Sequence, residues 1–189
     1  MARRKTKGYL TGLTGELLVA TELARLGFQV CLPSGNSPDL DMLAYRGGEV
    51  LAVQVKSAGV GNAIQLGLKK FLTLETDPET GVQVMTAKQP PLDDKLYVAF
   101  VYLGKQAGQD RIYVGRAPKI ADFLERQHLA YLGRNSGVRP GRNKESDHIA
   151  VAEKDVMDCA AFSTLTANPV FLWQRQQADP SPVLSEHSP

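Results

Sequence analysis

Two adjacent glycines between two alternating apolar segments constrain this chain more than any other feature. Residues 40–45 and 49–56 have the composition of β-strands, and Gly47 and Gly48 lie in the short link between them. A two-residue turn with positive φ at both positions is the commonest connection of a β-hairpin, and glycine adopts it without steric cost. We therefore predict a hairpin that turns at the two glycines.

The turn fixes the register of the hairpin, and that register brings four polar side chains to one face. Counting outward from the glycines, Asp41 lies opposite Gln54, and Asp39 lies opposite Lys56. Side chains alternate between the faces of a strand, and cross-strand partners share a face with Cβ atoms about 5 Å apart. Such a group is costly to bury unless its members pair or act chemically.

A helix predicted over residues 11–26 adds another acid to this group. The helix is expected to end at Gly27, because glycine is common just beyond a helix C-terminus. Glu16 falls inside the apolar arc of the helix, so it reaches the polar face of the hairpin if the helix packs on the sheet. The arc is formed by Leu13, Leu17, Val19, Ala20, Leu23 and Ala24.

The polar face has the composition of a magnesium site. Carboxylate and amide oxygens are the hard ligands that Mg²⁺ prefers. A divalent ion bound there would lower the pKa of a bound water and stabilise charge on a phosphate. Lys56, beside the ion, can position or deprotonate that water or steady the phosphate charge.

The remaining elements predict an α/β or α+β fold with a mixed β-sheet, a central hairpin and helices on both sides. We expect residues 1–10 to form a basic flexible arm, residues 11–176 a single domain, and residues 177–189 a disordered tail. Further strands are predicted at 28–32, 64–74, 82–85, 97–103 and 111–114, and further helices at 118–133 and 153–162.

Composition narrows the classes of function. Hydrophobic residues make up 43% and charged residues 22% of the chain, as in globular proteins. The longest apolar run, residues 97–103, is far shorter than the roughly 20 residues that cross a bilayer, and no apolar segment follows the basic N-terminus. We therefore expect a cytoplasmic protein without a membrane partner.

A net charge of only +2 means that any nucleic-acid surface must be a local patch. Two basic clusters are candidates. The one in the loop after residue 134 is either a solvated loop or a phosphate-contacting patch. The candidate nucleic-acid-binding residues are Arg3, Arg4 and Lys5 at the N-terminus, and Arg139, Arg142 and Lys144 in that loop.

The order of the site residues resembles the PD-(D/E)XK nuclease superfamily. Its three motif pieces are Gly15-Glu16 in the first helix, Pro38-Asp39-Leu40-Asp41 at a strand start, and Gln54-Val55-Lys56 in the next strand. The stretch from Thr14 to Ser57 is most similar to the Holliday-junction-resolvase-like branch. The third motif is a Gln-x-Lys variant, because Gln54 stands where the family usually has an acid.

The resemblance implies a restriction-endonuclease-like fold and a magnesium-dependent DNA endonuclease in which manganese can substitute. It implies that Asp41 is the main metal ligand, Glu16 a ligand through water, Gln54 a further ligand and Lys56 the catalytic lysine. Asp39 is the literal aspartate of the family motif and remains the alternative ligand, although the hairpin register favours Asp41. The implied substrate is double-stranded or branched DNA rather than RNA, and cutting two strands suggests a homodimer.

Other interpretations remain open. Taken singly, Glu16 can be a rim charge and Lys56 a solvated strand end. A neutral glutamine at position 54 weakens metal binding, so a lapsed nuclease fold serving as a nucleic-acid-binding or assembly module is the alternative function. Some active relatives, including an intron-encoded homing endonuclease, nevertheless have glutamine at this position. His128 is expected to be a packing residue of the helix at 118–133 rather than a catalytic base.

Overall fold

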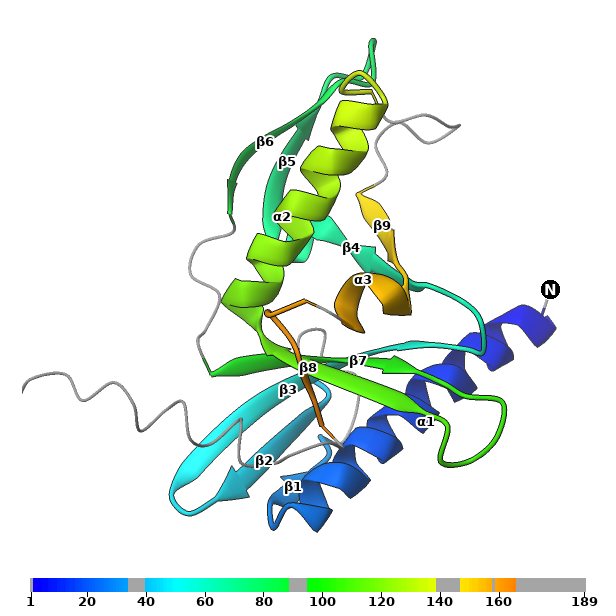
Figure 1. The fold of residues 1–189 in the computed structure, drawn as a ribbon, viewed down its shortest axis with the longest axis vertical. Coiled ribbons are helices and arrows are strands. Elements are labelled where there is room, and N and C mark those ends of the chain that lie inside the picture. The colour runs from blue at the N-terminus through cyan, green and yellow to red at the C-terminus, as the bar shows by residue number, and fades with distance from the viewer. Residues whose placement is uncertain (1, 34–39, 89–94, 139–146, 158, 166–189) are drawn as a thin grey trace, which may run out of the picture.

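The computed structural model describes residues 2–33, 40–88, 95–138, 147–157 and 159–165 (Figure 1). A long helix opens the chain, a series of strands follows it, and two further helices lie near the C-terminal end of the described part. The elements are α1 (Ala2–Arg25), β1 (Gln29–Cys31), β2 (Met42–Arg46), β3 (Glu49–Ala58), β4 (Ile64–Gly67), the short 3₁₀-helix η1 (Leu68–Lys70), β5 (Leu72–Thr76), β6 (Gln83–Lys88), β7 (Leu96–Tyr102), β8 (Arg111–Arg116), α2 (Ala117–Arg134), β9 (His148–Val151), α3 (Glu153–Met157) and β10 (Ser163–Thr164).

The main sheet has six strands in the order β1-β2-β3-β7-β8-β10. Strands β3 and β7 run parallel, and the other neighbours in this sheet are antiparallel. The β2–β3 hairpin lies within the sheet, between β1 and β7. This confirms the predicted α+β class with a mixed sheet.

Strand β7 lies in the middle of the sheet and is buried on both faces. Val98 and Phe100 belong to a core that includes α2, whereas Ala99 and Val101 belong to a second core that includes α1. A strand covered on both faces appears in the sequence as a continuous apolar run, which explains residues 97–103. Helices therefore flank the sheet on both sides, as predicted.

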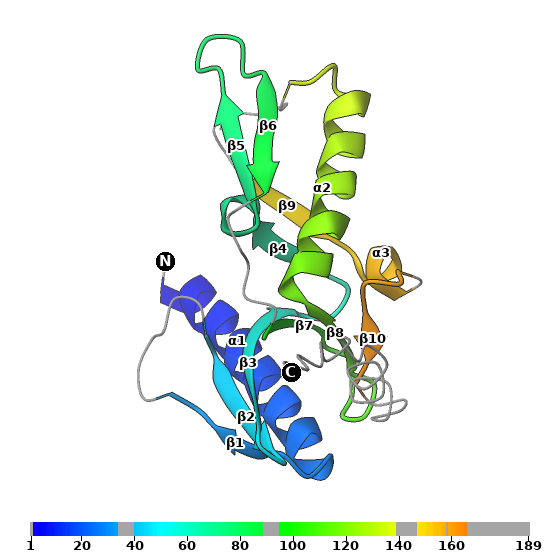
Figure 2. The ribbon, with the colours of Figure 1, turned by 90° about the vertical axis from the view of Figure 1, so that its left-hand side faces the viewer.

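A second layer of small sheets stands on the α2 side of the main sheet. Strands β4 and β9 pair with each other, and β5 and β6 form a separate hairpin. Figure 2 shows these four strands together with α2 above the main sheet. The predicted strand at 64–74 is interrupted by η1, and the predicted return at 82–85 is β6.

Helix α1 begins earlier than the sequence suggested. It includes the basic residues at positions 3–5, which were expected to form an arm before the helix. Lysine and arginine are good helix formers, so the absence of apolar periodicity there did not exclude a helix. Val19 and Leu23 of the predicted arc are buried, but Leu17 is 49% exposed.

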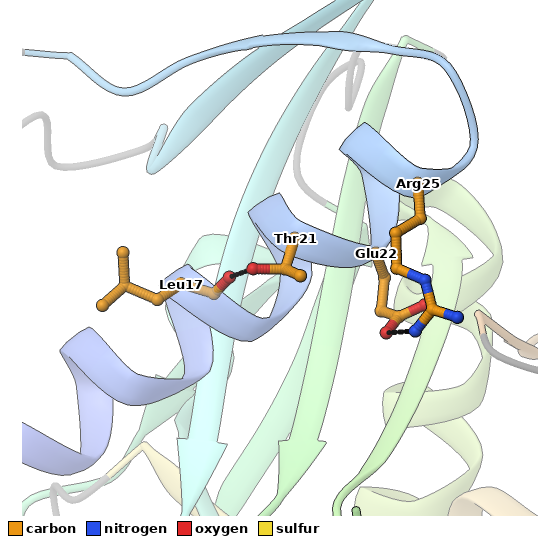
Figure 3. Close-up of polar contacts among 4 residues, drawn as sticks. All are labelled: Leu17, Thr21, Glu22 and Arg25. Carbon is orange, nitrogen blue, oxygen red and sulfur yellow. Dashed lines mark hydrogen bonds and ion pairs between the residues drawn. The ribbon is translucent and has the colours of Figure 1, made fainter.

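The outer side of α1 is held by local polar contacts (Figure 3). The Thr21 hydroxyl donates to the Leu17 carbonyl at 2.8 Å. One turn later, an Arg25 guanidinium nitrogen lies 3.2 Å from a Glu22 carboxylate oxygen. Pairs with this spacing stabilise a helix by a few tenths of a kcal/mol each. The helix thus keeps Leu17 at its polar surface and turns Val19 toward the sheet.

The last predicted helix is shorter than expected. Residues 153–162 were predicted to be helical, but α3 ends at Met157. The chain then turns, and the Phe162 ring packs against Phe100 at 5.2 Å and against Phe123 at 5.3 Å between ring centroids. This aromatic burial outweighs the local preference for helix.

Helix α2 matches the predicted helix at 118–133 to within one residue at each end. His128 is fully buried, and its ring stacks on Tyr131 with centroids 6.1 Å apart. The packing role predicted for His128 is therefore confirmed. In the described part of the chain, the structure has no helix with the length and apolarity needed to span a membrane.

Candidate active site

The two glycines form the predicted turn. Gly47 and Gly48 have φ angles of 59° and 91°, in the region that favours glycine. Arg46 pairs with Glu49, and the register continues without a break until Met42 pairs with Val53. The regular register ends at this pair, so the predicted pairing of Asp41 with Gln54 is not part of the ladder.

Asp41 lies just before β2, where the regular ladder with β3 ends. Its backbone N–H donates to the Val53 carbonyl at 3.0 Å. Its Oδ2 accepts from the Val55 backbone N–H at 2.6 Å, so the carboxylate caps β3 where strand β2 no longer pairs with it. A charged acceptor at this short distance makes a strong hydrogen bond. The bond fixes the Asp41 carboxylate beside the Gln-x-Lys segment.

Gln54 and Lys56 share one face of the sheet. They pair in parallel register with Val98 and Phe100, which belong to the α2-side core. Gln54 is only 4% exposed, whereas Lys56 is half-buried. Both side chains therefore point away from the face on which α1 packs, and Glu16 must reach them past the end of β2.

A glycine brings α1 close enough for this. A Cβ built on Gly15 would overlap the Ser57 hydroxyl and would lie 2.9 Å from the Ser57 Cβ. Ser57 directly follows Lys56, and its hydroxyl has no hydrogen-bond partner among the described residues. The helix backbone at Gly15 thus rests directly on β3. This contact brings the backbone next to Glu16 close to the backbone next to Lys56.

Replacing Gly15 with alanine is expected to destabilise the fold by about 1–3 kcal/mol, because the new methyl group overpacks the contact with Ser57. Gly12→Ala is the matched control. Nothing lies within 4 Å of a Cβ at Gly12, so the same change there should stabilise the helix by roughly 0.5–1 kcal/mol. Urea unfolding of the two variants measures the difference. Equal effects of the two substitutions would contradict the close helix contact.

Electrostatics show that Glu16 reaches the other site residues. Burial raises the pKa of Glu16 above its ordinary value of 4.5, and the Asp41 carboxylate raises it further. The Lys56 ammonium acts in the opposite direction and lowers this pKa. Glu16 therefore lies within electrostatic range of Asp41 and Lys56. The Asp41 carboxylate itself is held on the backbone of the residue after Gln54.

Asp41→Asn is expected to lower the pKa of Glu16, because it removes the repelling charge. Lys56→Met should raise this pKa by removing the attracting charge. Lys105→Met, in the β7–β8 loop, is the control and should leave it unchanged. NMR titration of the glutamate side-chain carboxyl carbons without metal measures all three. A Glu16 pKa that responds to neither site variant would separate Glu16 from the site.

The raised pKa of Glu16 also fixes the sign of a pH effect on stability. The unfolded state ionises Glu16 more readily than the folded state, so metal-free stability should fall as pH rises from 4.5 through the raised pKa. Glu16→Gln removes this ionisation, so its stability curve should be flatter over that range. Urea unfolding from acidic to neutral pH in EDTA tests this expectation. A wild type that gains stability relative to Glu16→Gln as the pH rises over this range would contradict it.

The donors at this site are two carboxylates and one amide oxygen. Among the described residues, no cluster of three or more His, Cys, Asp or Glu side chains is present. Gln54 is not among the residue types of such a cluster. Glu16, Asp41 and Gln54 still offer hard oxygen donors of the kind that Mg²⁺ accepts.

The structure does not describe the side chains of several predicted site residues. Asp39 and the basic residues Arg139, Arg142 and Lys144 lie outside the described residues. Arg3, Arg4 and Lys5 lie in the first turns of α1, and their side chains are likewise outside the description. Their proposed roles therefore stay predictions.

Sequence reasoning missed the structural use of Gly15 and Ser57. A glycine in the middle of a helix costs about 1 kcal/mol relative to alanine, so its presence one residue before Glu16 was a signal for close packing. No pattern identified Ser57 as its partner, because the contact joins elements far apart in sequence.

Comparison with known proteins gives one structural likeness. No protein-family model matches the chain, and no curated protein matches it. A bacterial homing endonuclease of known structure aligns with a TM-score of 0.42 and 13% sequence identity, covering 77% of this chain and 78% of that chain. A likeness at this level identifies no site residue and establishes no family.

Proposed function

We propose that this protein is a metal-dependent DNA endonuclease that hydrolyses phosphodiester bonds, with a Gln-x-Lys variant of the PD-(D/E)XK motif. The observation that carries the proposal is that the Asp41 carboxylate, fixed on the Val55 backbone beside the buried Gln54, and Lys56 both act on the pKa of Glu16. A helix, a strand start and a second strand contribute these residues, which is the arrangement that the family resemblance implies.

The residues present fit a divalent cation. Two carboxylates close enough to repel each other are held on a partly buried surface, and a cation between them would offset that repulsion. Asp41 uses Oδ2 to bind the Val55 backbone, so we assign its Oδ1 to the metal. Gln54 contributes its amide oxygen, and Glu16 acts through a water. Mg²⁺ bound there supplies an activated water and charge stabilisation for the phosphate, and Mn²⁺ can replace it.

Lys56 has a separate role in this proposal. Its half-buried ammonium lies within electrostatic reach of Glu16, at the same end of β3 as Asp41. From there it can orient the attacking water and stabilise the charge that grows on the phosphate oxygens. Such groups accelerate a reaction when they bind the transition state more strongly than the substrate.

A nicking assay tests the proposed activity. Supercoiled plasmid and branched DNA are incubated with wild-type protein in Mg²⁺, in Mn²⁺ and in EDTA. We expect cleavage in both metals and none in EDTA. Total RNA in the same assay is expected to remain intact, and its cleavage would point to a toxin-like RNA-directed nuclease. Cleavage that persists in EDTA would contradict the metal-dependent mechanism.

One observation favours a second function. Gln54 offers the metal a neutral amide oxygen, where a third carboxylate would bind it more strongly. Among the described residues, no cluster of acidic, histidine or cysteine side chains offers another metal site. The alternative is therefore a lapsed nuclease fold that binds nucleic acid or assembles with other proteins. Under this alternative, DNA binding persists without cleavage on every substrate.

The proposed substrate is double-stranded or branched DNA. A single small site that cuts both strands must act twice or act in two copies, so we also propose a homodimer on DNA. Analytical ultracentrifugation with and without a DNA duplex distinguishes a dimer formed on the substrate from a monomer that acts twice.

A further inference from the structure

A polar cavity of about 560 Å³ lies outside the candidate active site. It is enclosed by α2, by the β4–β9 pair and by α3, on the second layer of the fold. Cavities of roughly 300–1,000 Å³ are the usual size for small ligands. Its polar lining includes Gln65, Gln127, Tyr131, Arg134, His148 and Lys154. The sequence analysis assigned no role to this combination of residues.

Helix α2 presents polar side chains to the cavity, because several of them fall on the same face of the helix. Gln127, Tyr131 and Arg134 recur three and four positions apart, so they share one face of α2. The Tyr131 ring stacks on the buried His128, with an angle of 14° between the ring planes. This stack forms a rigid floor, and the exposed Arg134 lies one turn further along the helix.

Two cationic side chains line the cavity. Arg134 and Lys154 are exposed and come from different elements, and the exposed His148 lines it from a third. In the part of the chain that the structure describes, neither Arg134 nor Lys154 forms an ion pair with an acid. A bound anion would reduce the repulsion between the two cations.

The two aspartates near the cavity, Asp147 and Asp155, form contacts with other parts of the protein. Asp155 lines the cavity, but its Oδ2 accepts from the Ala152 backbone N–H at 3.0 Å. Asp147 lies 3.0 Å from the His148 Nδ1, and its other oxygen accepts from the Lys69 backbone N–H. Asp155 is thus the one acid that lines the cavity in the described part of the chain, against the two cations Arg134 and Lys154.

We propose that this cavity binds a phosphate group, with Arg134 and Lys154 neutralising its charge and the side-chain amides of Gln65 and Gln127 donating hydrogen bonds. A phosphate has several oxygens that accept strong bonds from arginine and lysine, so it matches a lining rich in donors. The group can belong to a free mononucleotide or to the DNA backbone. The proposal does not depend on the endonuclease activity.

Two binding measurements in EDTA distinguish these sources. Calorimetry with deoxyadenosine monophosphate, and with inorganic phosphate, detects a free ligand. Fluorescence anisotropy with a DNA duplex at several salt concentrations detects a backbone contact. The test variant is Arg134→Ala combined with Lys154→Ala. The matched control is Lys119→Ala combined with Arg126→Ala, which removes two exposed charges of α2 outside the cavity.

A mononucleotide site predicts saturable binding to the wild type that weakens at least about tenfold in the test variant and is unchanged in the control. A backbone site predicts no mononucleotide binding but a weaker duplex affinity in the test variant, with a salt slope smaller by about 0.9 per lost contact. Gln127→Leu leaves the net charge unchanged and should weaken whichever ligand binds.

Equal behaviour of the test and control variants toward both ligands would overturn the proposal, as would a wild type that binds neither. Because no step of these assays involves cleavage, a failure of the nicking assay leaves their outcome unaffected. Urea unfolding of each variant verifies that the exposed substitutions leave the fold intact.

Discussion

Asp41→Asn should abolish Mg²⁺ binding and lower plasmid cleavage by at least about a hundredfold. The substitution removes the charge that the proposal assigns to the metal. It keeps an oxygen that can accept from the Val55 backbone N–H, so β3 retains its cap. Calorimetry with Mg²⁺ and the nicking assay measure the two effects. The free energy of unfolding in EDTA should change little or rise, because Glu16 loses a repelling neighbour.

Asp39→Asn is the matched control for this prediction. Both residues are aspartates of the same short segment, and only one of them is expected to hold the metal. Loss of Mg²⁺ binding in Asp39→Asn, with retention in Asp41→Asn, would transfer the ligand role to Asp39. If both variants still bind Mg²⁺, neither aspartate holds the metal, and the nucleic-acid-binding module becomes the favoured function.

The hairpin shows how far the sequence alone determines the site. Glycines at both turn positions select a two-residue turn, and the register then follows by counting. Because a slip by one residue would turn every apolar side chain to the wrong face, the pairing from Arg46 with Glu49 to Met42 with Val53 was predictable. The contact of Asp41 was not, because the regular ladder ends before it and its carboxylate accepts from the Val55 backbone N–H.

The position of Glu16 was only partly predictable. Helical projection placed it on an inward arc, but the same projection also placed Leu17 there, and Leu17 is 49% exposed. The buried side of α1 is set by the contact of Gly15 with Ser57, which no local pattern contains. Tertiary contact, rather than hydrophobicity, therefore decides which residues of α1 face the sheet.

The predicted start of α1 and the predicted end of α3 were wrong for a similar reason. The basic segment before residue 11 lacks an apolar stripe, yet it is helical within α1. Residues 153–162 have helical composition, yet α3 stops at Met157 so that Phe162 can join the aromatic core. Patterns predict the existence of an element better than its ends, because the ends are set by packing partners distant in sequence.

The cavity beside α2 was not predictable as a site. Its basic residues lie on three elements, and Lys154 and His148 gave no signal of their own. Arg134 lies at the end of α2, just before the basic loop whose candidate residues lie outside the described part of the chain. Only the pairing of β4 with β9 brings His148 and Ile149 opposite the polar face of α2.

Lys56→Met should lower cleavage by roughly 10²- to 10⁴-fold while changing DNA affinity by only a few-fold. Methionine keeps most of the apolar stem of lysine and removes the charge. That charge is expected to act on the attacking water and on the transition state rather than on bound substrate. Lys105→Met, an exposed lysine in the β7–β8 loop, is the control and should cleave as the wild type does.

The variant Gln54→Glu distinguishes an active endonuclease that binds its metal weakly from a nuclease fold that has lost its activity. A glutamate at this position adds an anionic donor beside Asp41, so a live site should bind Mg²⁺ more tightly and keep its cleavage at lower Mg²⁺. A lapsed site has no cleavage for Lys56→Met to remove, although Gln54→Glu can then create it. Both variants are titrated with Mg²⁺ and Mn²⁺ on supercoiled and branched DNA. A wild type as inert as Lys56→Met on every substrate would reject the endonuclease, and duplex affinity retained in EDTA would then support the binding module.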